Sequence, residues 1–232
     1  MTQPIEGHTV QRYDGELNHL HLLTLEMGGF VIEQLASALA VLAAKDIKLA
    51  RNVIERDHHV NAMEVRADAE IVNVVTRRSP VARDLRAVMA ISKTIADLER
   101  IGDESAKVAE ISVAMFGGDN ADPSKSLMRD IRVVGDIAAS MLRKALTAFD
   151  QFDAGQAEEV LRMRADIDEE FQSALRRLAT FIMEDARNVG HTINVVLVIK
   201  ALERIGDYSR NIAESVIYLV KGDDVRHQVA EV

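Results

Sequence analysis

Apolar residues recur at a spacing of three or four along almost the whole chain, and no stretch shows the sustained alternation of a half-buried strand. This pattern predicts an all-α protein built from six long helices. The first helix is expected from about Tyr13 to Ala44, and Asp46 can cap the second. The second helix should end before Ser79-Pro80, where Ser79 suits an N-cap and Pro80 the first position of a third helix.

The remaining helix boundaries carry similar signals. Paired glycines stop a helix, whereas aspartate before proline and aspartate three residues before glutamine start one. These signals fall at Gly117-Gly118, at Asp122-Pro123, and at Asp153 with Gln156, and a further turn is expected from Asn188 to His191. The third helix is therefore expected to end at the glycines, and the later signals begin the fourth, fifth and sixth helices.

One segment of the chain occurs twice. Leu98 to Asp103 reads LERIGD and recurs letter for letter as Leu202 to Asp207. At the same offset of 104 residues, 9 of the 13 positions from 98 to 110 are identical, which chance does not explain. Each copy falls on the third helix of a half, so we expect two tandem, elongated three-helix bundles related by internal duplication. We place the first bundle at 1–118 and the second at 119–232, with a hinge over 117–120.

Composition narrows the possible functions. The chain is 48% apolar and 28% charged, as expected of a globular protein. It has no cysteine, so any metal must be bound by oxygen or imidazole. The net charge of -9 argues against nucleic acid as a partner. With a polar N-terminus and no apolar run long enough to span a bilayer, we expect a cytoplasmic protein that meets membranes only through its partners.

The repeated segment carries two carboxylates in each half, Glu99 with Asp103 and Glu203 with Asp207. Residues four apart lie on one face of a helix, where like charges repel each other. A hard cation, which prefers oxygen ligands, would reverse that repulsion. A solvated acidic face is the simpler explanation of one such pair. Its duplication within a repeat whose surroundings have diverged favours metal binding instead.

The second helix of each half is expected to complete these sites. At about 1.5 Å of rise per residue, the first motif comes level with Asp57 and Asn61, and the second motif with Asp168. Matching the two halves puts Arg164 where Asp57 stands, so the second site should be built differently from the first. The glycine inside each motif costs about 1 kcal/mol relative to alanine, and it indicates either close helix packing or close approach to an ion.

Other catalytic chemistry is not favoured. Glu16 with His19 and Glu55 with His58 have the Glu-x-x-His spacing of di-iron carboxylate proteins, but they should lie about 27 Å apart and the second half has no such pair. His58 and His59 are expected to be solvated, with a ligand role for His59 the lesser alternative. The chain also has no nucleotide-binding or nucleophile-elbow motif. We therefore expect a binding or regulatory protein and not an enzyme.

The two LERIGD segments resemble the signature of the PhoU family of phosphate-transport accessory and regulatory proteins. The resemblance extends over nearly the whole chain. Further segments that are similar to family positions are Met27 to Gly29, Asp84 to Arg86, Ile91 to Ile95, Met183 to Arg187, and Tyr218 to Gly222.

This resemblance implies that the duplicated motifs bind iron, manganese, magnesium or zinc ions. It also implies a cytoplasmic protein that bridges PstB, the ATPase of the phosphate ABC transporter, and the sensor histidine kinase PhoR. Such a protein represses the phosphate regulon when phosphate is plentiful. We also expect a homodimer. The alternative from another class of function is a metal-storing or redox-active carboxylate metalloprotein.

Overall fold

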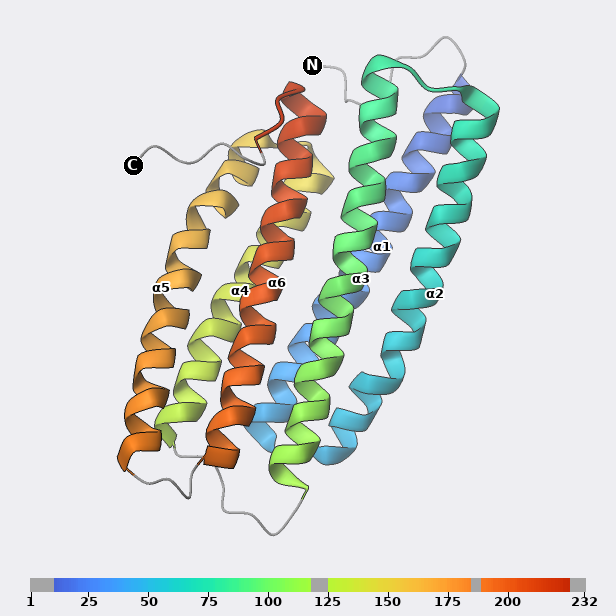
Figure 1. Ribbon diagram of the computed structural model, residues 1–232. Helices are drawn as coiled ribbons and strands as arrows, with labels where there is room; N and C mark the ends of the chain where they lie inside the picture. The colour runs from blue at the N-terminus through green and yellow to red at the C-terminus, as the bar shows by residue number, and fades with distance from the viewer. Residues whose placement is uncertain (1–10, 118–124, 185–188, 226–232) are drawn as a thin grey trace.

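The computed structural model describes residues 11–117, 125–184 and 189–225, and in these ranges it consists of helices and short connections without any strand (Figure 1). The six helices are α1 (Gln11–Ala44), α2 (Ile47–Arg78), α3 (Ala82–Phe116), α4 (Lys125–Gln151), α5 (Ala154–Glu184) and α6 (Val189–Lys221). The all-α class and the number of helices predicted from the sequence are therefore confirmed.

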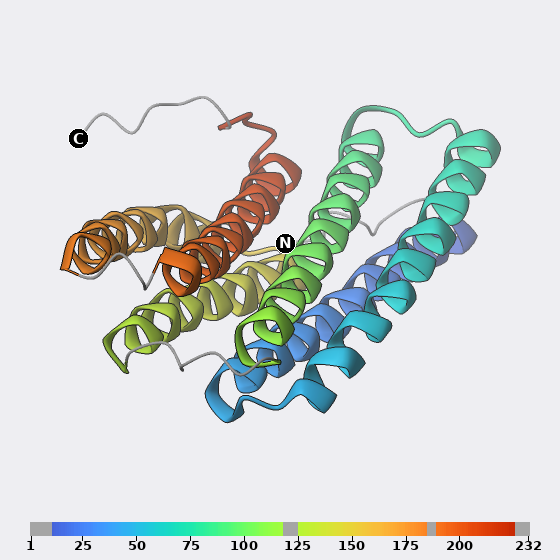
Figure 2. The ribbon, with the colours of Figure 1, turned by 60° about the horizontal axis from the view of Figure 1, so that its bottom comes forward.

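The helices form two three-helix bundles that lie side by side (Figures 1 and 2). Helices α1, α2 and α3 form one bundle, and α4, α5 and α6 form the other. The bundles meet where α3 packs along α6 and where α1 contacts α4. Helices α2 and α5 lie at opposite outer edges, so each contacts only the helices of its own bundle within the described part of the chain. The duplicated motifs on α3 and α6 consequently occupy the centre of the molecule.

A continuous aliphatic core joins the two bundles. It includes Leu98 and Ile101 from the first motif and Leu202 and Ile205 from the second, all fully buried. Burial of such aliphatic side chains is the main source of stability for helices of this length, which would be only marginally stable alone. The apolar positions of each motif thus anchor its helix. The domain boundary after residue 118 stays a prediction, and residues 118–124 lie outside the described part.

Two of the predicted helix caps are confirmed. The Asp46 carboxylate accepts hydrogen bonds from the backbone N–H groups of Lys48 (2.9 Å) and Leu49 (3.1 Å) at the start of α2. Asp153 does the same for Gly155 (2.8 Å) and Gln156 (3.1 Å) at the start of α5. Each aspartate accepts from backbone N–H groups that have no partner within the helix, so α2 and α5 begin with the same kind of N-cap.

The predicted start of the third helix at Ser79 and Pro80 is wrong. Ser79 is instead the C-cap of α2, in the left-handed region at φ 46° and ψ 57°, and its N–H donates to the carbonyl of Val75. α3 begins only at Ala82. A residue that precedes proline is disfavoured in the right-handed helical region, so the chain must leave α2 before Pro80. The predicted boundaries at Gly118 and Asp122-Pro123 lie outside the described residues, as does Asn188. The turn predicted to continue to His191 is wrong, because α6 already begins at Val189.

One described helix could cross a membrane by length and composition alone, namely the Asp14–Ala44 part of α1. Leu20, Val31 and Leu35 of this segment are buried in the core that the helices share, whereas Leu22 is exposed. Core helices of folded domains pass the same test, so α1 is explained by its place in the first bundle.

Candidate metal centre

The glycine of each repeated motif lets the second helix of its bundle come close. A Cβ atom on Gly102 would lie 3.1 Å from Val60 Cγ1 and 3.2 Å from Asp57 Oδ1. A Cβ atom on Gly206 would lie 2.7 Å from Ile167 Cδ1. All three distances are shorter than ordinary side-chain contacts. Close helix packing therefore accounts for both glycines, and in the first bundle the same approach brings Asp57 to the motif.

The first bundle gathers carboxylates on the facing sides of α2 and α3. Burial and then the negative charges of Asp103, Glu64 and Asp57, in that order, raise the pKa of Glu99 to about 7. Burial followed by the charge of Asp57 likewise raises the pKa of Asp103. We define the α2–α3 acidic cluster as Asp57, Glu64, Glu99 and Asp103. It contains the motif pair and Asp57, as the count of helical rise predicted.

Sequence reasoning missed Glu64. Burial and the negative charges of Asp68 and Asp103 raise the pKa of Glu64. It lies seven residues after Asp57, which places both on the same face of α2 two turns apart. That spacing was the signal that could have identified it.

A buried amide from α1 supports the cluster. The Gln34 side chain is 0% exposed, and its Nε2 donates to Asp57 Oδ1 at 3.1 Å and to the Gly102 carbonyl at 3.4 Å. Its Oε1 has no hydrogen-bond partner among the described residues, and neither does the buried Oδ1 of Asn61. Buried polar atoms are normally paired, so each of these two oxygens is available to accept from a further donor or to bind a cation.

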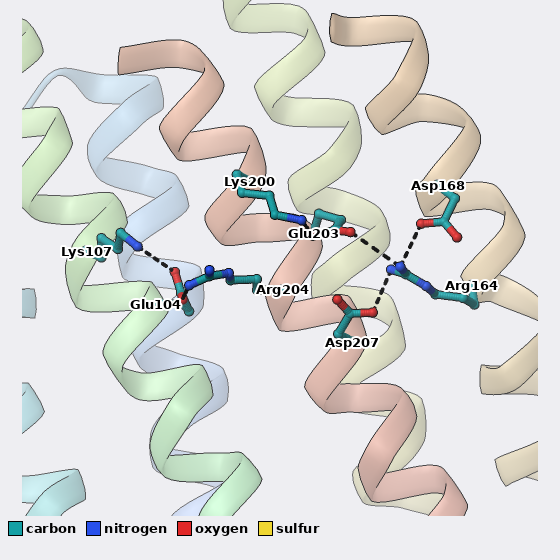
Figure 3. Close-up of polar contacts among 8 residues, drawn as sticks. All are labelled: Glu104, Lys107, Arg164, Asp168, Lys200, Glu203, Arg204 and Asp207. Carbon is teal, nitrogen blue, oxygen red and sulfur yellow. Dashed lines mark hydrogen bonds and ion pairs between the residues drawn. The ribbon is translucent and has the colours of Figure 1, made fainter. Parts of the chain in front are cut away.

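The arginine of each motif points away from its carboxylates. Arg100 Nη1 lies 3.2 Å from Asp97 Oδ1 on the same helix, and Arg204 Nη1 lies 2.8 Å from Glu104 Oε1 across the seam between the bundles (Figure 3). Arg100 therefore offsets only part of the repulsion that raises the pKa of Glu99. The α2–α3 acidic cluster is left with more negative than positive charge.

The donor set of this cluster fits a hard divalent cation, because every candidate ligand is an oxygen atom. Magnesium, manganese or iron suits such ligands better than zinc, which favours nitrogen and sulfur. In the described part of the chain, however, no three histidine or acidic side chains already converge on a single ion position. Asp103 and Asp57 are within hydrogen-bonding reach of each other, and this contact is one of the causes that raise the pKa of Asp103.

The second bundle brings Asp168, Glu203 and Asp207 together, but it does so around an arginine (Figure 3). The Arg164 guanidinium lies 2.9 Å from Asp168, 3.3 Å from Glu203 and 2.9 Å from Asp207. Its contact with Glu203 has hydrogen-bond geometry, whereas Nη1 meets Asp207 as an ion pair only. Lys200 Nζ adds a contact of 2.6 Å to Glu203. We define the α5–α6 ion-pair cluster as Arg164, Asp168, Lys200, Glu203 and Asp207.

The structure does not support a solvated acidic face for the second motif. Glu203 is only 5% exposed. A carboxylate at that depth requires a positive partner, and Arg164 and Lys200 provide two. Burial, only partly offset by the charge of Arg164, raises the pKa of Asp207. Whether Asp168, Glu203 and Asp207 bind a metal stays a prediction, and the present arrangement does not favour it.

The residues of the two Glu-x-x-His pairs have other surroundings. Glu16, of the first Glu-x-x-His pair, holds Arg78 through hydrogen bonds of 2.7 and 2.8 Å. His58 and His59 are exposed, and the His59 ring contacts Phe30 at a centroid distance of 4.7 Å. These surroundings give no support to a di-iron site.

Comparison with known proteins decides the family. The PhoU domain matches twice, over residues 24–112 and 131–216, once in each bundle. The chain belongs to the PhoU family. A PhoU relative from Pseudomonas putida, named a phosphate-specific transport system accessory protein PhoU homolog, is 41% identical over 97% of this chain and 87% of its own length. The PhoU protein of Escherichia coli, with the corresponding name, is 36% identical over 96% of this chain and 91% of its own length.

Solved PhoU structures share the fold. The crystal structure of PhoU from Pseudomonas aeruginosa superposes with a TM-score of 0.87 at 40% identity, covering 91% of this chain and all of the other. The phosphate transport system regulatory protein PhoU from Streptococcus pneumoniae superposes with a TM-score of 0.83 at 28% identity, covering 91% of this chain and 98% of the other. The resemblance and the two-bundle architecture deduced from the sequence are thus confirmed.

Proposed function

We propose that this chain is a cytoplasmic regulator of phosphate transport that represses the phosphate regulon when phosphate is plentiful. It does so as an adaptor between the ATPase of the phosphate ABC transporter and the sensor histidine kinase that controls the regulon. The observation that carries this proposal is the double PhoU match, one in each bundle, together with relatives named accessory proteins of phosphate-specific transport over nearly their full length.

The fold supports binding as the mode of action. Two long bundles lie side by side and present broad helical faces (Figure 2). One continuous apolar core is buried within and between them. A chain with a net charge of -9 can meet basic patches on its partners with an affinity that falls as salt rises. The proposed homodimer would use the same kind of surface.

The proposal includes a divalent metal at the α2–α3 acidic cluster. Glu99 and Asp103 from α3 and Asp57 from α2 would hold it, with Glu64, Asn61 and Gln34 as further oxygen donors. A bound cation supplies the positive charge that four neighbouring carboxylates lack, and so it would hold α2 against α3. In this regulator the metal shapes a surface for partners and carries out no reaction.

Two experiments test the regulatory role. Deletion of the gene should leave phosphate-starvation genes switched on in phosphate-rich medium, and a variant with Asp57, Glu99 and Asp103 changed to alanine should restore repression poorly. Pull-downs of the transporter ATPase and of the cytoplasmic part of the kinase, with and without chelator, then test the partners. If neither partner is retained in any condition and deletion leaves the phosphate response normal, the regulatory role is wrong.

A second candidate is a metal-storing or redox-active carboxylate protein. The uncompensated α2–α3 acidic cluster favours it, because such clusters also take up iron. Iron uptake and turnover assays on the purified chain separate the two: sustained oxidation or release of many ions per chain would support storage or redox chemistry, whereas stoichiometric binding without turnover supports the regulator.

A further inference from the structure

The second helices of the two bundles are equivalent at an offset of 107 residues. At that offset four of the five buried residues of α2 meet a buried counterpart in α5, and the fifth, Val74, meets the half-buried Phe181. The four buried pairs are Ala50 with Ala157, Val53 with Val160, Val60 with Ile167, and Ala67 with Ala174. The same register pairs Asp57 with Arg164. The central carboxylate of the first cluster is therefore replaced by a guanidinium in the second.

The neighbouring positions have changed in the same direction. Gln34 and Glu64, which contribute oxygens in the first bundle, correspond to Met141 and Phe171 in the second. The Met141 sulfur lies 3.5 Å from a Cβ placed on Gly206, much as Gln34 Oε1 lies 3.4 Å from a Cβ placed on Gly102.

A second cation has also been added. Lys200 stands where the first bundle has Ala96, and its Nζ lies 5.2 Å from the centre of the Phe171 ring. The second bundle has thus lost three oxygen-bearing side chains, at the positions of Gln34, Asp57 and Glu64, and gained two cations.

We propose that Arg164 is a resident cation that takes the place of a metal in the second bundle, so that this chain binds divalent metal in the first bundle alone. The inference rests on the metal site proposed above for the α2–α3 acidic cluster. Arg164 contacts all three carboxylates that were predicted to ligate a metal, and its side chain is only 22% exposed. A guanidinium cannot release its proton in a protein. A metal ion could enter only by expelling it, against the further charge of Lys200.

The two bundles would therefore respond differently to metal. The ion pairs of Arg164 hold α5 against α6, so this contact does not depend on metal supply. The contact of α2 with α3 remains open to metal, because its carboxylates have no equivalent of Arg164. Metal availability would then change one face of the regulator and leave the other constant.

The first test counts manganese bound by the full-length, untagged protein in equilibrium dialysis. Asp103→Asn should remove most of the bound manganese, and Asp207→Asn should leave it unchanged. Because both variants replace a carboxylate by an isosteric amide, each is the matched control of the other. Loss of manganese on Asp207→Asn would overturn the inference.

The second test exchanges the decisive residues. Arg164→Asp combined with Lys200→Ala removes both cations and restores the aspartate of the first bundle, and it should raise the bound manganese toward twice the wild-type amount. Adding Asp207→Asn should remove the gain. The converse change, Asp57→Arg, should abolish binding in the first bundle. If the rebuilt protein is folded by circular dichroism and gains no manganese, the inference is wrong.

The outcomes separate the inference from the proposal on which it rests. A wild-type protein that binds no manganese would refute the proposed metal site in the first bundle. If the wild type binds no manganese but the Arg164→Asp, Lys200→Ala protein does, the result would still support Arg164 as the group that occupies the second site.

Discussion

The α2–α3 acidic cluster and the α5–α6 ion-pair cluster are built on the same six residues, LERIGD, yet they have opposite electrostatic characters. In the first, burial and neighbouring carboxylates raise the pKa of Glu99 to about 7. In the second, two cations lie within 3.3 Å of Glu203. The motif alone therefore does not determine its chemistry. The helix that packs against it decides, through Asp57 in one bundle and Arg164 in the other.

The largest expected effect comes from Arg164→Ala in metal-free protein. This change leaves the buried Glu203 beside two other carboxylates with only Lys200 as a partner, and should lower the free energy of unfolding by about 3 kcal/mol. Urea denaturation measures it. Arg162→Ala, an exposed arginine two residues away, is the control and should change little. Equal losses for the two variants would show that the α5–α6 ion-pair cluster does not stabilise the fold.

Metal should stabilise only one bundle. Manganese at 100 times its dissociation constant should raise the free energy of local opening in α2 and α3 by up to about 2.7 kcal/mol. Hydrogen–deuterium exchange followed by mass spectrometry should show this slowing in α2 and α3 and none in α5 and α6. If manganese slowed hydrogen exchange equally in both bundles, the claim that only the first bundle binds metal would be refuted.

The pH dependence of metal-free protein should show a smaller effect. The pKa of Glu99 is raised from 4.5 to about 7, so the folded state keeps a proton that the unfolded state has released. The stability contributed by protonated Glu99 is therefore fully present below about pH 4.5 and lost as pH rises through about 7. Glu99→Gln should flatten this decline in urea midpoints between pH 5 and pH 8. Glu169→Gln, at an exposed position on α5, should not.

The smallest effect is one that the two bundles should share. Asp46→Ala and Asp153→Ala each remove a side-chain cap from the second helix of a bundle. Each should lower the Tm by about 2–4 °C. Thermal unfolding followed by circular dichroism compares them with Asp166→Ala, which alters an exposed position within α5. Clearly unequal losses would mean that the bundles differ in more than their charged clusters.

The sequence by itself determined the helical class, the duplication and the place of each motif. Helical periodicity and a letter-for-letter repeat are local properties of the chain, so they could be read without coordinates. Regular helical rise also brought Asp57 level with the first motif and Asp168 level with the second. Alignment of the two halves also showed that Arg164 occupies the position in the second half that Asp57 occupies in the first.

Only the tertiary structure decided what these residues do. Gln34 reaches Asp57 from another helix, and Arg164 joins three carboxylates on two helices, which no spacing within one helix can show. Burial of Glu203 and the raised pKa of Glu99 depend on side chains that surround them in space. Charge interactions depend on distances and on exclusion of water, and both arise only when the helices pack.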